Sequence, residues 1–314
     1  MNDYELLDKY NPNTWDELVG QDHIVSYFKK IIKEPLKYPH NYILNGGYGT
    51  GKTSTANIFY NELKKVKNTF KYDFDASVIG NKEDMKNIKS VIDNIFIFSQ
   101  DFRVIIFDEI QEASKSSQSL FLKTLENKNS DYLKDKNLYF FFLTTDSSRL
   151  IPTIISRCIE LNFLFISSDD VRKRINQITE IEQIFIDERS VNLIIEKCEG
   201  HLRDAIKLLN VYMIMKDEFK NIICNTQKII YEYMFTDNKT INDIKIFPVN
   251  ILIKDLNKLF TKIINRNIDE SFLNIIQLFE LYMKYKNYVT TIDDFISVMN
   301  ILKKFISMKG QTFK

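Results

Sequence analysis

The sequence predicts an α/β fold in which a doubly wound parallel sheet is followed by helical domains. Between residues 40 and 165, continuous apolar runs such as "FRVIIFDE" and "LYFFFLTTD" alternate with helical patterns such as "SSQSLFLKTLEN". Apolar runs of this kind are typical of strands buried on both faces of a parallel sheet. After about Phe165 the strand signals fade, and apolar residues recur at the three- and four-residue spacing of helices.

Three domains are expected from these changes along the chain. Residues 1–165 are assigned to the α/β domain, residues 166–225 to a small helical domain and residues 226–314 to a third, all-helical domain. The segment "SSDDVRKRINQITEIEQ" opens with serine and aspartate, which cap helices, and the next helical stretch is interrupted at Gly200. A chain of 314 residues, 44% of them hydrophobic, is long enough for two or three domains.

Composition argues against several classes of protein. No run of about 18 apolar residues is present and the N-terminus is too polar for a secretory signal, so we expect no membrane contact and a cytoplasmic location. Cys158, Cys198 and Cys224 form no C-x-x-C pair, which argues against a disulfide framework or a metal–thiolate site. The 43 basic and 42 acidic residues nearly cancel, so any contact with DNA has to come from a local patch.

A glycine-rich loop marks the first candidate site. The chain has eight glycines, and four of them fall between positions 46 and 51, directly after the strand candidate "NYILN" and before an amphipathic helix. The stretch "GGYGTGKT" matches G-x-x-x-x-G-K-[ST], in which backbone N–H groups and a helix N-terminus face phosphates. The residues expected to contact ATP here are Gly46, Gly47, Tyr48, Gly49, Thr50, Gly51, Lys52, Thr53 and Ser54.

Two side chains of this loop and two acids after a later strand complete the predicted chemistry. Lys52 is expected to reach the β- and γ-phosphates, and the Thr53 hydroxyl to bind Mg²⁺. The run "VIIFDE" reads as a buried strand that ends in Asp108 and Glu109. Asp108 would hold the metal ion and Glu109 would polarise the attacking water. The pattern predicts binding of ATP with Mg²⁺, followed by hydrolysis.

Four further motifs occur in order along residues 5–212. They are "KYNPNTWDELVGQDHIV", "DEIQEASKSSQSLFLKTLE", "LTTDSSRLIPTIISRC" and "EGHLRDAIKLL". The ordered set resembles that of the AAA+ clamp loaders, such as the gamma/tau subunit of bacterial DNA polymerase III and the small subunits of replication factor C. The resemblance implies an AAA+ P-loop domain, a helical lid and an all-helical C-terminal collar, the collar being assigned by position alone.

The resemblance also assigns roles to single residues. Thr145 would take the sensor 1 position near the γ-phosphate, and Arg203 would act as sensor 2 from the lid. Asn11 stands where the family has arginine, which leaves the role of that arginine open. The residues that would line the adenine pocket are Tyr10, Pro12 and Val19.

The chain departs from the family pattern in three further respects. Gln111 replaces a histidine after the Asp-Glu pair, "ENKN" replaces an E-P-P segment, and the four zinc-binding cysteines of bacterial gamma subunits are missing. The replaced E-P-P segment suggests altered local packing with no lost catalytic group. The missing cysteines suggest a compact, zinc-free form, closer to replication factor C small subunits or to virus-encoded loaders.

Arg157, in "TIISRCIEL", has several possible roles. The neighbouring Cys158 could carry thiol chemistry, the whole stretch could be core, or the arginine could pair with a nearby acid on the surface. By resemblance Ser156, Arg157 and Cys158 form the S-R-C motif of clamp loaders, in which the arginine completes the ATP site of the neighbouring subunit. That role implies an oligomeric ring.

The resemblance implies a clamp loader subunit that opens a ring-shaped sliding clamp and loads it on primer–template DNA. Its expected partners are the other subunits of a homo- or hetero-oligomeric ring, expected to be a pentamer, together with the clamp and DNA. By the same resemblance, Lys82, Lys86 and Lys115 are the candidate DNA contacts, because the helices at these positions line the chamber that follows the DNA backbone in clamp loaders. The alternative is that these lysines form an ordinary solvated face. Alternatives are a branch-migration or helicase-loader ATPase and a catalytically silent scaffold subunit of a loader.

Overall fold

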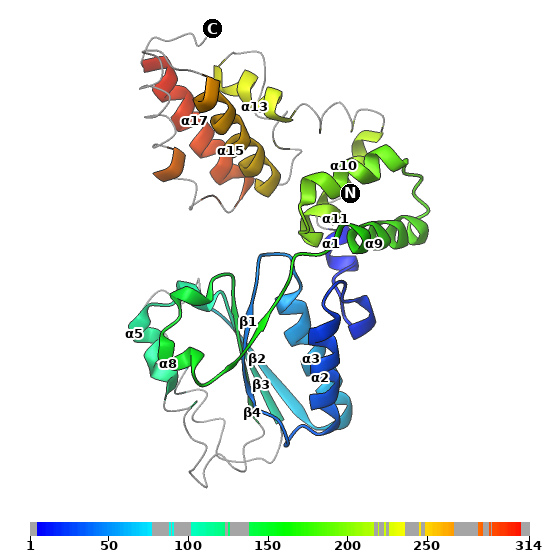
Figure 1. Ribbon diagram of the computed structural model, residues 1–314, viewed down its shortest axis with the longest axis vertical. Coiled ribbons are helices and arrows are strands. Elements are labelled where there is room, and N and C mark those ends of the chain that lie inside the picture. The colour runs from blue at the N-terminus through cyan, green and yellow to red at the C-terminus, as the bar shows by residue number, and fades with distance from the viewer. Residues whose placement is uncertain are drawn as a thin grey trace. The chain divides into compact units, whose positions relative to one another are not determined.

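In the part of the chain that it describes, the computed structural model contains a five-stranded, fully parallel sheet (Figure 1). It describes residues 5–76, 88, 90, 102–122, 125, 138–216, 219, 223, 226–235, 245, 249–266, 282–284, 289 and 291–308. The spatial order of the strands is β2-β3-β4-β1-β5. Their bounds are β1 Asn41–Asn45, β2 Thr69–Asp75, β3 Phe102–Asp108, β4 Leu138–Thr144 and β5 Ile159–Asn162. This arrangement confirms the predicted α/β fold class.

The two most apolar runs of the sequence form the middle of the sheet. Every residue of β4 is buried, and in β3 only the final Asp108 is not. The two strands lie side by side, with Ile105 opposite Phe140 and Ile106 opposite Phe141. A strand covered on both faces has no solvated side, which explains why these segments lack an alternation of polar and apolar residues.

Helices cover both faces of the sheet (Figure 1). On one face, α2 (Asp22–Lys33) and α3 (Lys52–Val66) pack on alternate strand residues, with the rings of Phe28 and Phe59 centred 5.7 and 5.2 Å from that of Phe141. On the other face, the strand residues that alternate with the first set pack against α8 (Pro152–Ile155). They also pack against the short helical segments that follow β3, next to α5 (Lys115–Gln118). Successive residues of a strand point to opposite faces, so each strand contributes to both cores.

The strand order positions the candidate site. In a parallel sheet all carboxyl ends meet at one edge, and β4 lies between β1 and β3. The last residues of these strands, Asn45, Asp108 and Thr144, therefore lie at the same edge. Ligands of open α/β sheets bind at this edge.

The chain divides into two compact units, and neither unit is a single continuous stretch of the sequence. One unit comprises Tyr10–Arg174 together with Gly200–Leu202, and it contains the sheet. The other comprises Met1–Lys9, Ile175–Glu199 and Arg203–Lys314. The three domains predicted from the sequence divide the chain differently, and they stay a prediction.

The second unit is built from helices in its described parts. Its helices are α1 Glu5–Lys9, the end of α9 Ser168–Ile181, α10 Glu188–Cys198, α11 Leu202–Met215, α13 Thr226–Phe235, α15 Val249–Arg266 and α17 Ile292–Met308. Lys197 Nζ of α10 lies 2.7 Å from Asp255 Oδ2 of α15, and Tyr233 Oη of α13 donates to Asn300 Oδ1 of α17 at 2.7 Å. These contacts join helices that lie far apart in the sequence. No helix in the described part of the chain is long and apolar enough to cross a membrane.

One partly buried histidine predicts a pH dependence of stability. His40 Nε2 lies 3.0 Å from the Pro35 carbonyl oxygen, and because a carbonyl only accepts, Nε2 carries the hydrogen. Burial lowers the pKa of His40 below 6.5 in spite of this bond. The unfolded chain therefore binds a proton at a higher pH than the folded chain. The free energy of unfolding should decrease as the pH falls below 6.5, by at most about 1.4 kcal/mol per pH unit from this group.

Urea unfolding above and below this pH, compared between the wild type and His40→Gln, measures the contribution of the group. The variant should lose less stability on acidification, because the uncharged amide binds no proton in this range. Equal losses in both proteins would contradict the assignment to His40.

Candidate functional site

The glycine-rich loop connects β1 to α3, and its glycines are required by close contacts. A Cβ at Gly46 would lie 2.7 Å from the Phe163 carbonyl oxygen, and one at Gly51 would lie 2.8 Å from a methyl group of Leu18. Gly51 also has φ +100°, in the left-handed region, at the position before α3. At Gly51, only glycine allows both the close contact with Leu18 and the positive φ without strain.

Lys52 and Thr50 stabilise the loop through hydrogen bonds to its own carbonyl groups. Lys52 is 7% exposed, and its ammonium group donates to the carbonyl oxygens of Gly46 at 2.7 Å and Gly47 at 2.9 Å. Thr50 Oγ1 donates to the Gly47 carbonyl at 2.7 Å. The loop therefore holds a cation among its backbone groups at the N-terminus of a 15-residue helix, an arrangement that suits a phosphate anion.

Two oxygen ligands predicted for Mg²⁺ lie together. Thr53 Oγ1 at the start of α3 donates to Asp108 Oδ2 at the end of β3, at 3.0 Å. Asp108 Oδ1 accepts from the Glu109 backbone N–H at 3.0 Å, which fixes the carboxylate. A hydroxyl and a carboxylate at this edge are the hard oxygen donors that Mg²⁺ prefers, so the residues fit the ion.

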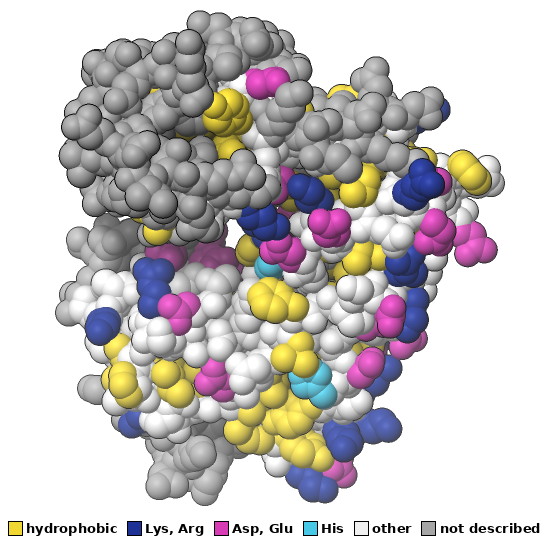
Figure 2. All heavy atoms as spheres, turned by 45° about the horizontal axis from the view of Figure 1, so that its top comes forward, with side chains coloured by type: hydrophobic (Ala, Val, Ile, Leu, Met, Phe, Trp, Pro, Cys, Tyr) yellow, Lys and Arg dark blue, Asp and Glu magenta, His cyan; other side chains and the backbone are white. Residues whose placement is uncertain are grey.

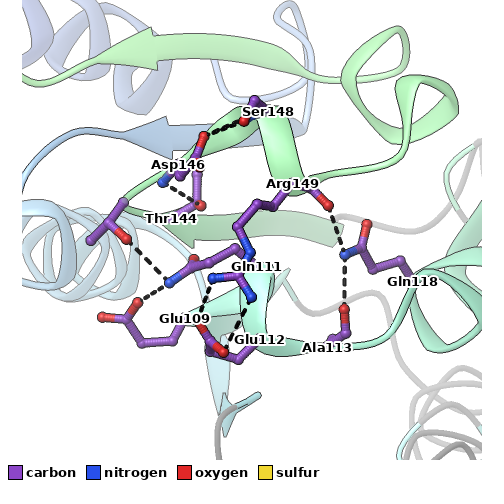
Figure 3. Close-up of polar contacts among 10 residues, drawn as sticks. Glu109, Gln111, Glu112, Ala113, Gln118, Thr144, Asp146, Ser148 and Arg149 are labelled. Carbon is purple, nitrogen blue, oxygen red and sulfur yellow. Dashed lines mark hydrogen bonds and ion pairs between the residues drawn. The ribbon is translucent and has the colours of Figure 1, made fainter. Parts of the chain in front are cut away.

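Glu109 and Thr145 are joined by a glutamine whose role the sequence did not reveal. Gln111, only 5% exposed, donates from Nε2 to the Glu109 carboxylate and to Thr145 Oγ1 at 3.2 Å (Figure 3). Glu109 has φ 50°, in the left-handed region, and the short helical turn that follows it carries Gln111 back toward Glu109. The predicted water-polarising acid and the predicted sensor 1 residue therefore share one donor.

A second layer of contacts joins the same two loops, which follow β3 and β4 (Figure 3). Arg149 Nη1 lies 2.8 Å from Glu112 Oε1. The fully buried Gln118 donates to the Ala113 carbonyl at 3.0 Å and accepts from the Ile151 N–H at 2.9 Å. Sequence reasoning missed Gln118. The sequence offered one signal of its role, because the helical pattern places this glutamine at a position expected to be buried.

Polar side chains that sequence reasoning also missed hold the predicted adenine-pocket segment to the rest of the unit that contains the sheet. Gln21, fully buried, donates to the Leu164 carbonyl at 2.7 Å. Arg174 Nη2 donates to the Tyr10 carbonyl at 3.2 Å, and its guanidinium lies 5.7 Å from the centre of the Tyr10 ring. Tyr10 is buried, whereas Pro12 and Val19 are partly exposed.

Asn11, which stands in place of the family's arginine, contacts the first turn of α3. Its side-chain oxygen accepts from Ser54 Oγ at 3.0 Å. The N-terminal segment is therefore attached directly to a predicted nucleotide-binding residue.

Arg157 lies near the opposite edge of the sheet from the glycine-rich loop. Asn41 Nδ2, at the amino end of β1, donates to the Arg157 carbonyl at 3.3 Å, whereas the loop follows the carboxyl end of the same strand. Four residue steps along a strand span about 13 Å. The guanidinium itself donates to the Thr153 carbonyl at 2.8 Å.

The thiol interpretation of the same stretch is not favoured. Burial raises the pKa of the Cys158 thiol to about 12, although the nearby charge of Arg157 opposes the shift. The nucleophilic and metal-binding form is the thiolate, so a neutral, partly buried thiol is inert. Cys158 and Cys198 are free cysteines, and no cluster of three potential metal ligands from His, Cys, Asp or Glu occurs among the residues that the structure describes.

The remaining predicted residues are spread over the chain. Arg203 is exposed in the first turn of α11, and Lys115 is exposed at the start of α5. Lys82 and Lys86 lie outside the described residues. On the face drawn in Figure 2, basic and acidic side chains are interspersed over the described surface. That mixture accords with the nearly balanced charges of the sequence.

Comparison with known proteins agrees with this geometry. Residues 42–166 match the family described as "ATPase family associated with various cellular activities (AAA)". The chain is 28% identical over 221 residues to DNA polymerase III subunit tau of Bacillus subtilis, covering 64% of this chain and 38% of that protein. It is also 28% identical over 240 residues to a replication factor C small subunit of Picrophilus torridus, covering 69% and 71% of the two chains.

Among solved structures, a similar fold occurs in the Thermotoga maritima RuvB Holliday junction branch migration motor. The two chains are 20% identical with a TM-score of 0.55, and the match covers 88% of this chain and 80% of that one. At this identity the likeness concerns the fold alone. The chain spans less than two fifths of the length of the tau subunit.

Proposed function

Because residues 42–166 match the AAA ATPase family, we propose that the protein binds and hydrolyses ATP with Mg²⁺ as a subunit of a clamp loader. In this role it opens a ring-shaped sliding clamp and loads it on primer–template DNA. The observation that carries the ATPase part is the meeting of Lys52, Thr53, Asp108 and Glu109 at one edge of the sheet. These residue types at this edge suit phosphoryl transfer to water.

Each side chain has a distinct part in the proposed reaction. The loop amides and Lys52 bind the phosphates, while Thr53 and Asp108 hold Mg²⁺, which supplies positive charge to the phosphate oxygens when bound. Glu109 polarises the attacking water. Gln111 keeps the Glu109 carboxylate oriented and ties it to Thr145, which senses the γ-phosphate.

The role of Gln111 predicts a selective loss of turnover. Gln111→Ala removes the donor that orients Glu109, so kcat should fall about 10- to 100-fold while ATP binding stays unchanged. Gln111→His keeps a ring N–H donor and should retain most of the activity. Steady-state hydrolysis and calorimetric ATP titration of both variants test this. Wild-type turnover by the alanine variant would contradict the role.

The clamp loader part of the proposal is supported by relatives and by the position of Arg157. The relatives that align along about two thirds of the chain are named as DNA polymerase III tau and replication factor C subunits. Arg157 lies away from the carboxyl edge of its own sheet. We propose that it completes the ATP site of a neighbouring subunit in a ring, expected to be a pentamer.

The helical regions and the lysines have proposed roles in the same assembly. Residues 166–225 act as the lid, with Arg203 as sensor 2, and residues 226–314 act as the oligomerisation collar. Lys115, with Lys82 and Lys86, contacts the DNA backbone. The described helices α9, α10 and α11, and then α13, α15 and α17, support the helical character of both regions. The assembly is expected to work in the cytoplasm.

One experiment separates the clamp loader from the alternatives. The ATPase rate of the purified protein is measured alone, and then with the sliding clamp of the same genome and a synthetic primer–template. Stimulation by clamp and primer–template together supports the proposal, with blunt duplex DNA as the control. A rate that ignores the clamp would contradict it, and stimulation by a four-way junction would favour a branch-migration motor. If a loader complex loses its ATPase activity without this chain but keeps it with a Lys52→Ala chain, the protein would be a silent scaffold subunit.

A further inference from the structure

Three aromatic side chains, one of them from the glycine-rich loop, contact one another. The ring of Tyr48, within the loop, stacks on the ring of His201 with centroids 4.0 Å apart and planes 4° apart. Phe165 packs edge-on against the same histidine, at 5.0 Å. We call Tyr48, Phe165 and His201 the aromatic clasp. His201 is 7% exposed, so this contact is packed rather than incidental.

The backbone around the clasp leaves no room for side chains. A Cβ at Gly47 would lie 3.0 Å from a ring carbon of Phe165 and 3.4 Å from His201. A Cβ at Gly200 would lie 2.9 Å from the Ile166 carbonyl oxygen, and Gly200 has φ +83°. Glycine on both sides therefore lets the loop and the segment before α11 approach each other closely.

A hydrogen bond fixes the direction of one loop peptide. His201 Nδ1 lies 2.8 Å from the Tyr48 carbonyl oxygen, and because the carbonyl only accepts, Nδ1 carries the hydrogen. In a planar trans peptide the C=O and the following N–H point in opposite directions. The bond that draws the Tyr48 carbonyl toward His201 therefore turns the Gly49 N–H away from it. Phosphate loops bind their anion through N–H groups of this kind.

We propose that His201 is a positioning residue for nucleotide binding, acting through Tyr48. It sets the loop conformation in which the Gly49 N–H is available to a phosphate. The inference rests on the proposed ATP binding and adds to it a residue for which no motif match assigns a role. Residues Gly200–Leu202 belong to the same compact unit as the loop, and Arg203 follows directly in the chain. The clasp thus joins the segment Gly200–Leu202 to the phosphate loop within one unit.

Five single variants test the stacking contact and the hydrogen bond, and among them His201→Ala removes both. His201→Phe keeps a ring and loses the donor, and His201→Asn keeps a donor and loses the ring. Tyr48→Ala removes the ring from the loop side, and Tyr60→Phe, on α3 outside the loop, is the control because it changes a tyrosine elsewhere in the same unit. Calorimetric titration with Mg²⁺ and ATP measures the dissociation constant, and thermal unfolding reports whether each variant is folded.

The dissociation constant for ATP should rise about 5- to 30-fold in His201→Ala and in Tyr48→Ala, and less in His201→Phe and His201→Asn. Tyr60→Phe should bind ATP like the wild type. The double variant Tyr48→Ala/His201→Ala should be little weaker than either single variant, because both remove the same contact. In hydrolysis assays KM should rise while kcat stays within about twofold, as expected for binding lost equally from ground and transition states.

Two results would overturn the inference while leaving the proposed function intact. Folded His201→Ala and Tyr48→Ala proteins that bind ATP as tightly as the wild type would show that the clasp does not position the loop. Fully additive effects in the double variant would show that the two residues do not act together. A wild-type protein that binds no ATP would instead overturn the proposed function, and the inference with it.

Discussion

Replacing Glu109 by glutamine is expected to reduce ATP hydrolysis about 10²- to 10⁴-fold while ATP binding is retained. The amide has nearly the same shape as the carboxylate but lacks the charge that polarises water. Gln111 Nε2 donates to this carboxylate, so the variant also places two amide groups in contact. Phosphate release at saturating ATP gives kcat, and calorimetry gives the affinity.

Glu62→Gln is the matched control for this prediction. Glu62 lies in the C-terminal half of α3, about 15 Å along the helix from Lys52, and pairs with Lys65 at 2.6 Å. A surface pair of this kind contributes little, so the control should hydrolyse ATP at the wild-type rate. Undiminished hydrolysis by Glu109→Gln would show that another group polarises the water.

Replacing Arg157 by alanine is expected to abolish stimulated hydrolysis, with a loss on the order of 10³-fold, while each chain still binds ATP. The arginine would stabilise the charge that grows on the γ-phosphate in a neighbouring subunit, so its removal affects the transition state more than the ground state. Arg189→Ala, at an exposed position in the first turn of α10, is the control and should keep full activity. The assay is hydrolysis in the presence of clamp and primer–template DNA.

Mixing variants tests whether the arginine acts between chains. Lys52→Ala should not bind ATP but still carries Arg157, and Arg157→Ala binds ATP but lacks the arginine. If neighbouring copies in a ring share a site, the mixture should recover part of the activity that each variant lacks alone. A mixture that stays inactive would contradict an arginine acting between copies of this chain. Loss of ATP binding by Arg157→Ala would instead indicate a role within its own chain.

The fold class could be predicted because the relevant signals are local. Two apolar runs with no polar alternation became β3 and β4 at the centre of the sheet. The glycine cluster and the Lys-Thr pair after it marked a turn between a strand and a helix, which the structure confirms for β1 and α3. Such features follow from the backbone preferences and burial of neighbouring residues, which a single sequence displays.

The side chains that orient the site could not be predicted in the same way. Gln111 was noted only as a departure from a family motif, and Gln21, Gln118 and Arg174 were not singled out. Each of them is buried and bonds to backbone or side-chain groups of another loop. A polar residue in a sequence does not reveal which distant group will satisfy it once it is buried.

The sequence by itself determined that this chain carries a phosphate loop, a strand ending in two acids and enough apolar runs for a parallel sheet. Only the tertiary structure decided which of these groups meet. Thr53 contacts Asp108 across 55 positions, and His201 contacts Tyr48 across 153. Periodicity reports which face of an element is buried, but the strand order β2-β3-β4-β1-β5 and the packing of loops decide what lies opposite that face. The aromatic clasp therefore became visible only in three dimensions.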